Sequence, residues 1–159
     1  MKTVRKRRLK NKTNYKLRIG MLKSGKPRVV VRKTNKYIII QYVESMEGKD
    51  NIKFGISSRE LLKNGWPEEN KGSLKSISAA YLTGYLFGKK MPKEEVIFDF
   101  GLERNIHGSR IYAVLNGLVD GGAKIAYDKK VFPKEERVIG EHLKGNLSDI
   151  VKKIKDKIK

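Results

Sequence analysis

The sequence predicts an α/β protein in which a mixed sheet packs with helices and is preceded by an extended basic arm. Two β-branched runs, at 28–32 and 37–43, are joined by a short polar turn, which indicates an antiparallel hairpin. Later strands alternate with helical patterns, which is typical of a parallel βαβ unit. The arm is predicted from charge, because 15 of the 37 Lys and Arg residues lie in the first 36 positions and no acid precedes Glu44. Such a block repels itself and orders against a counter-charge.

The arm is assigned to residues 1–12 and the α/β domain to residues 13–126. The domain opens with a short helix for which Thr13 is the predicted N-cap. Three residues of this helix have the spacing of one apolar face: Tyr15, Ile19 and Leu22. The two hairpin strands follow, and a third strand is predicted at 52–56 after a polar turn.

The second half of the chain alternates between helices and strands. Ser57 and Glu60 form a capping-box pattern that opens a short helix. After a polar loop at 68–72, four elements are predicted in order: a helix at 74–87, a buried strand at 96–100, an amphipathic helix at 109–119 and a last strand at 123–126. Residues 127–159 are predicted to be a C-terminal extension that ends in a basic amphipathic helix.

Composition narrows the class of protein. The net charge of +20 far exceeds the magnitude of roughly 2 to 8 that keeps a small domain soluble, so we expect a polyanionic partner, with nucleic acid first. The chain has no Cys and two His, which disfavours a structural zinc site. No apolar run approaches the roughly 18 residues of a membrane span. We therefore expect a cytoplasmic protein with no cofactor and no membrane partner.

One glycine pattern resembles a nucleotide-binding motif. Gly84-x-x-x-Gly88-Lys89 is similar to a phosphate loop, but its spacing is one residue short and Lys90 replaces the Ser or Thr. The pattern also lies inside a predicted helix, so we do not expect it to bind a nucleotide.

Three acids are compatible with a two-metal nuclease on an α/β sheet: Asp99, Glu103 and Asp120. Such catalysis needs several converging carboxylates, and the sequence gives no sign of them. Asp99 is expected instead to order a loop or to pair with Arg104 or Arg110. The sequence therefore predicts a protein that is not an enzyme.

Basic residues near the N-terminus are the candidate RNA-binding set. Those expected to neutralise closely spaced phosphates are Arg5, Lys6, Arg7, Arg8, Lys10, Lys12 and Arg18. Those expected to present the hairpin to a second backbone tract are Lys26, Arg28, Arg32, Lys33, Asn35 and Lys36. Tyr15 and Tyr37 are candidates for stacking on unpaired bases, and each is also a plausible core aromatic, with core favoured for Tyr15.

The loop that leads from the strand at 96–100 into the next helix is a second candidate. Helix N-terminal amides, Arg104, Ser109 and Arg110 are placed to converge on one phosphate, and His107 lies in the same loop. A plain helix cap with solvated arginines explains the same residues, and both interpretations stay open.

Four blocks of residues, in order, resemble a known family. They are the run at 13–41 with Ser24-Gly25-Lys26-Pro27-Arg28, then Ser78-Ala79-Ala80-Tyr81-x-x-Gly84, then Asp99-x-Gly101 with His107-Gly108-Ser109-Arg110, and finally Ala113 to Gly122. In order and spacing they resemble large-subunit ribosomal protein eighteen, the universal 5S rRNA-binding family. Residues 127–142, with Phe132-Pro133 and Gly140-Glu141-His142, are similar to its archaeal and eukaryotic branch.

This resemblance implies a non-catalytic ribosomal component. Its partners would be 5S rRNA, the large-subunit (23S-type) rRNA to which 5S rRNA is attached in the central protuberance, and neighbouring large-subunit ribosomal proteins. The alternative is a general nucleic-acid-binding or RNA-chaperone protein, which would bind DNA and arbitrary RNA with similar affinity.

Overall fold

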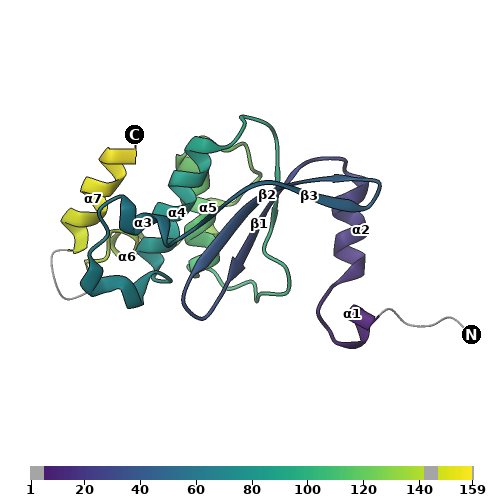
Figure 1. Ribbon diagram of the computed structural model, residues 1–159, viewed down its shortest axis with the longest axis horizontal. Coiled ribbons are helices and arrows are strands. Elements are labelled where there is room, and N and C mark those ends of the chain that lie inside the picture. Colours follow the sequence, from purple (N-terminus) through teal and green to yellow (C-terminus); the bar gives the residue numbers. More distant parts are fainter. Residues whose placement is uncertain (1–5, 142–146, 159) are drawn as a thin grey trace, which may run out of the picture.

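A four-stranded mixed sheet in the order β3-β2-β1-β4 forms the centre of the computed structural model, which describes residues 6–141 and 147–158 (Figure 1). The antiparallel strands are β1 (Arg28–Lys33), β2 (Ile38–Met46) and β3 (Lys49–Ser57), and β4 (Ile97–Asp99) pairs in parallel with β1. The predicted α/β class, with an antiparallel hairpin and a parallel part, is confirmed.

The β1–β2 hairpin follows from strand alternation and one turn residue. In the register, Val29 faces Tyr42 and Val31 faces Ile40, and all four side chains are buried. At the turn, the Thr34 amide donates to the Tyr37 carbonyl at 2.8 Å, and the Thr34 hydroxyl accepts from the Tyr37 amide at 2.9 Å. This local closure sets the register that places every second residue in the core.

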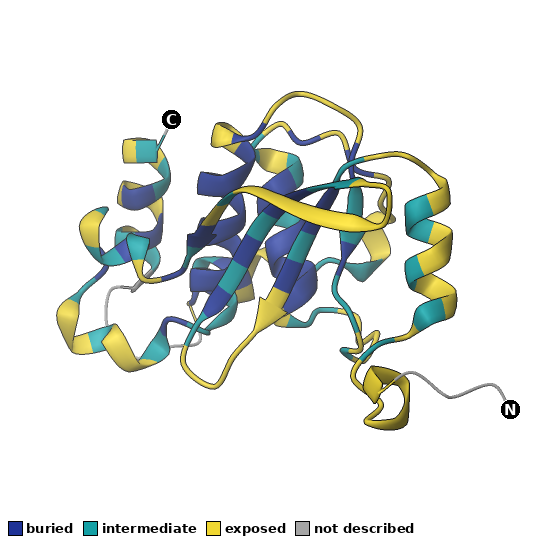
Figure 2. Ribbon diagram, turned by 45° about the vertical axis from the view of Figure 1, so that its right-hand side comes forward, coloured by how far each residue is buried: buried dark blue, intermediate teal, exposed yellow. Residues whose placement is uncertain are grey.

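Helices α4 (Ile77–Lys90) and α5 (Arg110–Asp120) pack behind the sheet in the view of Figure 1, and much of both is buried in Figure 2. Their backbones are in close contact. A Cβ on Gly84 would lie only 2.3 Å from the Val114 carbonyl oxygen, and one on Gly117 only 2.1 Å from the Tyr81 carbonyl oxygen. The Gly84-x-x-x-Gly88 spacing therefore serves close helix packing.

The N-terminal segment differs from its prediction. Residues Lys6–Leu9 form a short helix, α1, so the described part of the arm is not fully extended. Helix α2 (Tyr15–Lys23) is capped by Asn14, whose side chain accepts from the amides of Lys16 and Leu17. Thr13 is thus not the cap, because its hydroxyl accepts from Arg7 Nε at 2.9 Å.

The predicted apolar face of α2 is not part of the core. Ile19 is 51% exposed and no residue of α2 is buried. The helix lies beside the end of the sheet where β2 turns into β3 (Figure 1), and its half-buried positions include Arg18, Met21 and Leu22. Arg18 lies on the half-buried side of the helix, where it forms an ion pair with Asp50 of β3.

Three smaller elements also differ from prediction. Helix α3 (Glu60–Lys63) lacks a side-chain cap, because the Ser57 hydroxyl accepts from the Arg59 amide instead. The predicted loop at 68–72 forms a 3-10 helix, η1 (Glu68–Ser73). The predicted strand at 123–126 is reduced to one parallel bridge between Glu95 and Lys124.

The C-terminal segment contains η2 (Lys129–Val131), α6 (Glu135–Ile139) and α7 (Leu147–Ile158). Val138, Val151 and Ile154 are buried in the same hydrophobic cluster as the sheet and α4. Lys155 Nζ lies 2.5 Å from the Tyr81 hydroxyl, which in turn donates to Asp120 at 2.5 Å. The terminal helix therefore docks on the α/β body. None of the helices within 6–141 and 147–158 is long and apolar enough to cross a membrane.

Candidate nucleic-acid interface

The described cations of the arm are all exposed: Lys6, Arg7, Arg8, Lys10 and Lys12. The arm turns back at Asn11, whose φ is +49°, and the Lys12 amide donates to the Arg7 carbonyl at 2.9 Å. Arg5 lies outside the described residues. The structure thus gathers the arm cations around one short helix and turn at the end of the molecule next to α2 (Figure 1).

Arg18 attaches α2 to the sheet, since its Nη2 lies 2.9 Å from Asp50 Oδ2. Burial alone would raise the pKa of Asp50, but hydrogen bonds from Ser45 and Arg18 and the positive charge of Arg28 outweigh it and hold that pKa below its usual value. Asp50 is therefore ionised at neutral pH, and α2 is held at the β2–β3 turn by charge.

Arg28, predicted to contact RNA, is 3% exposed and is occupied within the protein. Its guanidinium donates to Asp50 Oδ1 at 2.6 Å, to the Ser45 hydroxyl at 2.9 Å and to Asp99 Oδ2 at 3.4 Å. A phosphate contact requires an accessible guanidinium, so the prediction for Arg28 is corrected. Sequence reasoning missed this role because both carboxylates are distant in the chain.

Three further candidates are partly exposed and already paired with acids of the protein. Lys26 Nζ lies 2.7 Å from Glu95, Arg32 Nη2 lies 3.4 Å from Asp99, and Lys33 Nζ lies 2.9 Å from Glu103. Exposed ion pairs are worth about 0–1 kcal/mol, so Lys26 and Lys33, whose acids are also accessible, can exchange an internal acid for a phosphate at small cost, whereas Arg32 pairs with a buried carboxylate. Asn35 and Lys36 are exposed at the hairpin turn.

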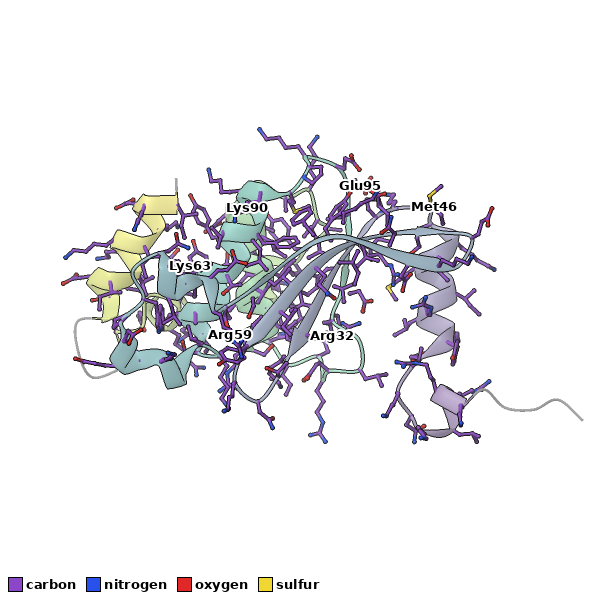
Figure 3. The ribbon with its side chains drawn as sticks, viewed as in Figure 1. Arg32, Met46, Arg59, Lys63, Lys90 and Glu95 are labelled. Atoms are coloured by element: carbon purple, nitrogen blue, oxygen red, sulfur yellow. The ribbon has the colours of Figure 1, made fainter. Side chains whose placement is uncertain are left out.

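The two candidate stacking tyrosines are both half-buried. Tyr37 packs against the hydrophobic core, and the Arg59 guanidinium lies 4.1 Å from its ring centre. Figure 3 places Arg59 at the same end of the sheet as Arg32. Because Arg59 covers one face of the ring, a base can stack there only by displacing it. For Tyr15, which lies on α2, stacking stays a prediction.

Asp99 orders the loop after β4, which is one of the two roles that the sequence predicts for it. Its carboxylate is almost buried and accepts from the Gly101 amide at 2.8 Å. Its ion-pair partners are Arg28 and Arg32, and the expected partners Arg104 and Arg110 are not used. Gly101 has φ +70°, and a Cβ there would lie 3.0 Å from the Arg32 guanidinium carbon.

The remaining loop candidates lie at the start of α5. Arg104, His107 and Arg110 are exposed, and the His107 ring meets the Tyr112 ring edge-on at 6.3 Å. Arg104, Ser109 and Arg110 line one cavity of about 790 Å³, and His107 does not line it. Ser109 occupies the N-cap position but makes no side-chain capping bond. The convergence of these residues on one phosphate stays a prediction.

The acids considered for a nuclease do not meet. Asp99 and Glu103 lie before α5, whereas Asp120 is its last residue, and 11 helical residues span about 16 Å. Asp120 accepts from Tyr81, and burial together with this hydrogen bond raises the pKa of the Tyr81 hydroxyl. Over the described parts of the chain, no three His, Asp or Glu side chains form a group that could hold a metal ion.

Comparison with known proteins identifies the family. The family described as ribosomal large subunit proteins 60S L5 and 50S L18 matches residues 1–97. Large ribosomal subunit protein uL18 of Korarchaeum cryptofilum is 43% identical over 141 residues, which cover 87% of this chain and 70% of that relative. The uL18 protein of Aeropyrum pernix is 40% identical over 142 residues, covering 87% of this chain and 64% of the relative.

A third relative agrees, since uL18 of Methanothrix thermoacetophila is 43% identical over 139 residues, covering 86% of this chain and 80% of its own length. The similarity extends well beyond the basic N-terminal segment and includes most of the α/β body. The chain therefore belongs to the family of large-subunit ribosomal proteins 60S L5 and 50S L18, whose members are structural components of the ribosome in the cytoplasm and not enzymes.

Proposed function

We propose that this protein binds 5S rRNA and attaches it to the large-subunit rRNA in the central protuberance, next to neighbouring ribosomal proteins. The observation that carries the proposal is that the cations of the arm are exposed while several cations of the α/β domain are held by its own acids. The five described arm cations are exposed, whereas acids of the body hold Arg18 and Arg28. Membership of a ribosomal family supports RNA as the polyanion.

The arm is the primary contact in this proposal. Its exposed cations neutralise RNA phosphates and release condensed counterions, which favours binding at low salt. If about eight phosphates are neutralised in all, the affinity falls with the logarithm of salt concentration at a slope of roughly −6. A nearly flat slope would contradict an electrostatic mechanism.

The hairpin is the second contact. Lys36 and Asn35 lie at its tip, and Arg32 and Lys33 lie at the end of β1 just before it. Arg32 and Lys33 must leave Asp99 and Glu103 to bind a phosphate, so each contributes less to affinity than an unpaired arm cation. The hairpin therefore orients the RNA more than it holds it.

Removal of residues 1–12 tests the proposal. No side chain of 6–12 is buried, so the shortened protein should lose only the small helical signal of α1 from its circular-dichroism spectrum and should keep the melting temperature of the full chain. Its affinity for 5S rRNA should fall by at least tenfold in a mobility-shift assay. Loss of the folded signal would mean that the arm is structural.

Competition distinguishes 5S rRNA binding from general nucleic-acid binding. Unlabelled 5S rRNA should displace labelled 5S rRNA at concentrations at which duplex DNA and an unrelated RNA of equal length do not. Equal displacement by all three competitors would support a general nucleic-acid-binding protein and contradict the proposal.

A further inference from the structure

A cavity of about 790 Å³ lies where the β1–β2 hairpin, the loop before α5 and the first residues of α4 and α5 meet. Four cations from separate parts of the chain line it: Lys33, Arg104, Arg110 and Arg137. One acid, Glu103, also lines it and is held by Lys33 at 2.9 Å. The cavity therefore has an excess of positive charge.

The two helices run in the same direction. Gly84 of α4 contacts Val114 of α5, and Gly88, one turn later, contacts Leu118. Their N-termini therefore lie at the same end of the helix pair. The cavity is lined there by residues from both starts: Ser76, Ser78, Ser109 and Arg110. Each helix N-terminus carries partial positive charge, and two adjacent ones repel each other unless an anion lies between them.

Two hydroxyl groups in this region have no hydrogen-bond partner within the described chain. They are the Oγ atoms of Ser78 and Ser109. Ser78 is 1% exposed, and both residues line the cavity. Buried hydroxyls are nearly always hydrogen-bonded in folded proteins, so two orphaned groups at one cavity indicate a missing acceptor.

The start of α5 also lacks its usual acceptor. Ser76 caps α4 by accepting from the Ala79 amide at 3.2 Å, whereas Ser109 makes no such bond at α5. The first amides of a helix have no partner inside it, so those of Arg110 and Ile111 stay available to a ligand. Amides, hydroxyls and guanidinium groups are all donors, and a phosphate offers more acceptor sites than a carboxylate.

We propose that this cavity binds one backbone phosphate of RNA, with the hydroxyls of Ser78 and Ser109 and the first amides of α5 as donors and with Arg104, Arg110 and Arg137 as counter-charges. The proposal rests on the proposed function and adds to it a built site in the body, separate from the arm. Arg137 belongs to α6, so the C-terminal segment contributes to this RNA contact.

Inorganic phosphate without RNA tests the site by itself. In nitrogen-15 NMR spectra of the full chain, phosphate should shift the Ile111 amide saturably at constant ionic strength. Ser78→Ala and Arg110→Gln should each weaken this binding about tenfold, as expected for the loss of a hydrogen bond to a charged group. Lys124→Gln is the matched control, because Lys124 is exposed beyond the opposite end of α5.

Three results would overturn the phosphate site. The first is the absence of a saturable shift of the Ile111 amide. The second is an equal shift with acetate in place of phosphate, which would indicate a carboxylate from a protein partner. The third is a Lys124→Gln variant whose phosphate affinity falls as much as that of Ser78→Ala or Arg110→Gln. Ser78→Ala should also leave the melting temperature unchanged or raised, since it removes an orphaned hydroxyl and improves helix propensity. A lower melting temperature would mean that the hydroxyl already has a partner in the fold.

RNA binding by the same variants separates this inference from the proposed function. Arg110→Gln should weaken both phosphate and 5S rRNA binding, whereas Arg8→Gln should weaken only RNA binding. If RNA binding depends on Arg8 but phosphate does not bind, the cavity proposal alone is wrong. If phosphate binds but the unmodified protein has no affinity for 5S rRNA, the assignment to RNA is wrong together with the proposed function.

Discussion

The Nη2 atom of Arg28 lies 2.6 Å from Oδ1 of Asp50, in a position where Arg28 is shielded from solvent. Asp50 lies on β3 and also binds Arg18, so one carboxylate connects β1, β3 and the helix α2 that follows the arm. A second carboxylate, Asp99, holds the other side of Arg28 and reaches Arg32. Helix α2, which follows the arm, is thereby attached to the sheet through alternating charges.

Replacing Asp50→Asn should lower the free energy of unfolding by about 2–4 kcal/mol, because it removes the closer of the two carboxylates that compensate the buried Arg28 and leaves only Asp99 at 3.4 Å. Urea unfolding measures the change. Glu44→Gln is the control, since Glu44 of β2 pairs with Lys53 of β3, the strand of Asp50, with both side chains well exposed. That change should cost less than about 1 kcal/mol. Equal effects would mean that burial of Arg28 is unimportant.

Stability should decrease in acid partly through Asp50. Its pKa in the folded protein lies below the ordinary 3.8, so its contribution is fully present above that value and is lost as the pH falls through the folded pKa. Between about pH 6 and about pH 3, the unmodified protein should lose more free energy of unfolding than Asp50→Asn does. Equal losses would exclude Asp50 as a contributor.

Gly117→Ala should destabilise the protein by about 3 kcal/mol or more, because the new Cβ would lie 2.1 Å from the Tyr81 carbonyl oxygen and would force α4 and α5 apart. Gly20→Ala on α2 is the matched control, with nothing within 4 Å of its Cβ. It should be neutral or stabilising by up to about 1 kcal/mol. Thermal or urea unfolding compares the two variants.

The salt dependence of RNA binding should be sensitive to the arm. The triple change Arg7→Gln, Arg8→Gln and Lys10→Gln should reduce the magnitude of the slope against log salt by about 2 to 3. A control with the same loss of charge is Lys152→Gln, Lys153→Gln and Lys157→Gln, on the exposed face of α7. Its slope should change little. Equal changes would mean that net charge, and not the position of the arm, controls binding.

Patterns that depend on near neighbours in the chain predicted their elements well. The β-branched runs on either side of the Thr34 turn became β1 and β2, and the amphipathic pattern at 109–119 became α5, whose buried face includes Ile111, Leu115 and Leu118. The cap at Thr13 was wrong because Asn14, one residue later, offers a better-placed acceptor and Arg7 already uses the Thr13 hydroxyl.

The sequence alone determined three features of this protein: the charge of the arm, the alternation of strands and helices, and the order of the family blocks. Each is a property of composition or of short spacing. The tertiary structure decided which cations stay exposed. The partners of Arg28 lie 22 and 71 residues away, and the cavity at the starts of α4 and α5 forms only because their glycines let the helices run side by side. Pairing between strands and contact between helices that are far apart in the chain bring such residues together, and no local pattern encodes these distant contacts.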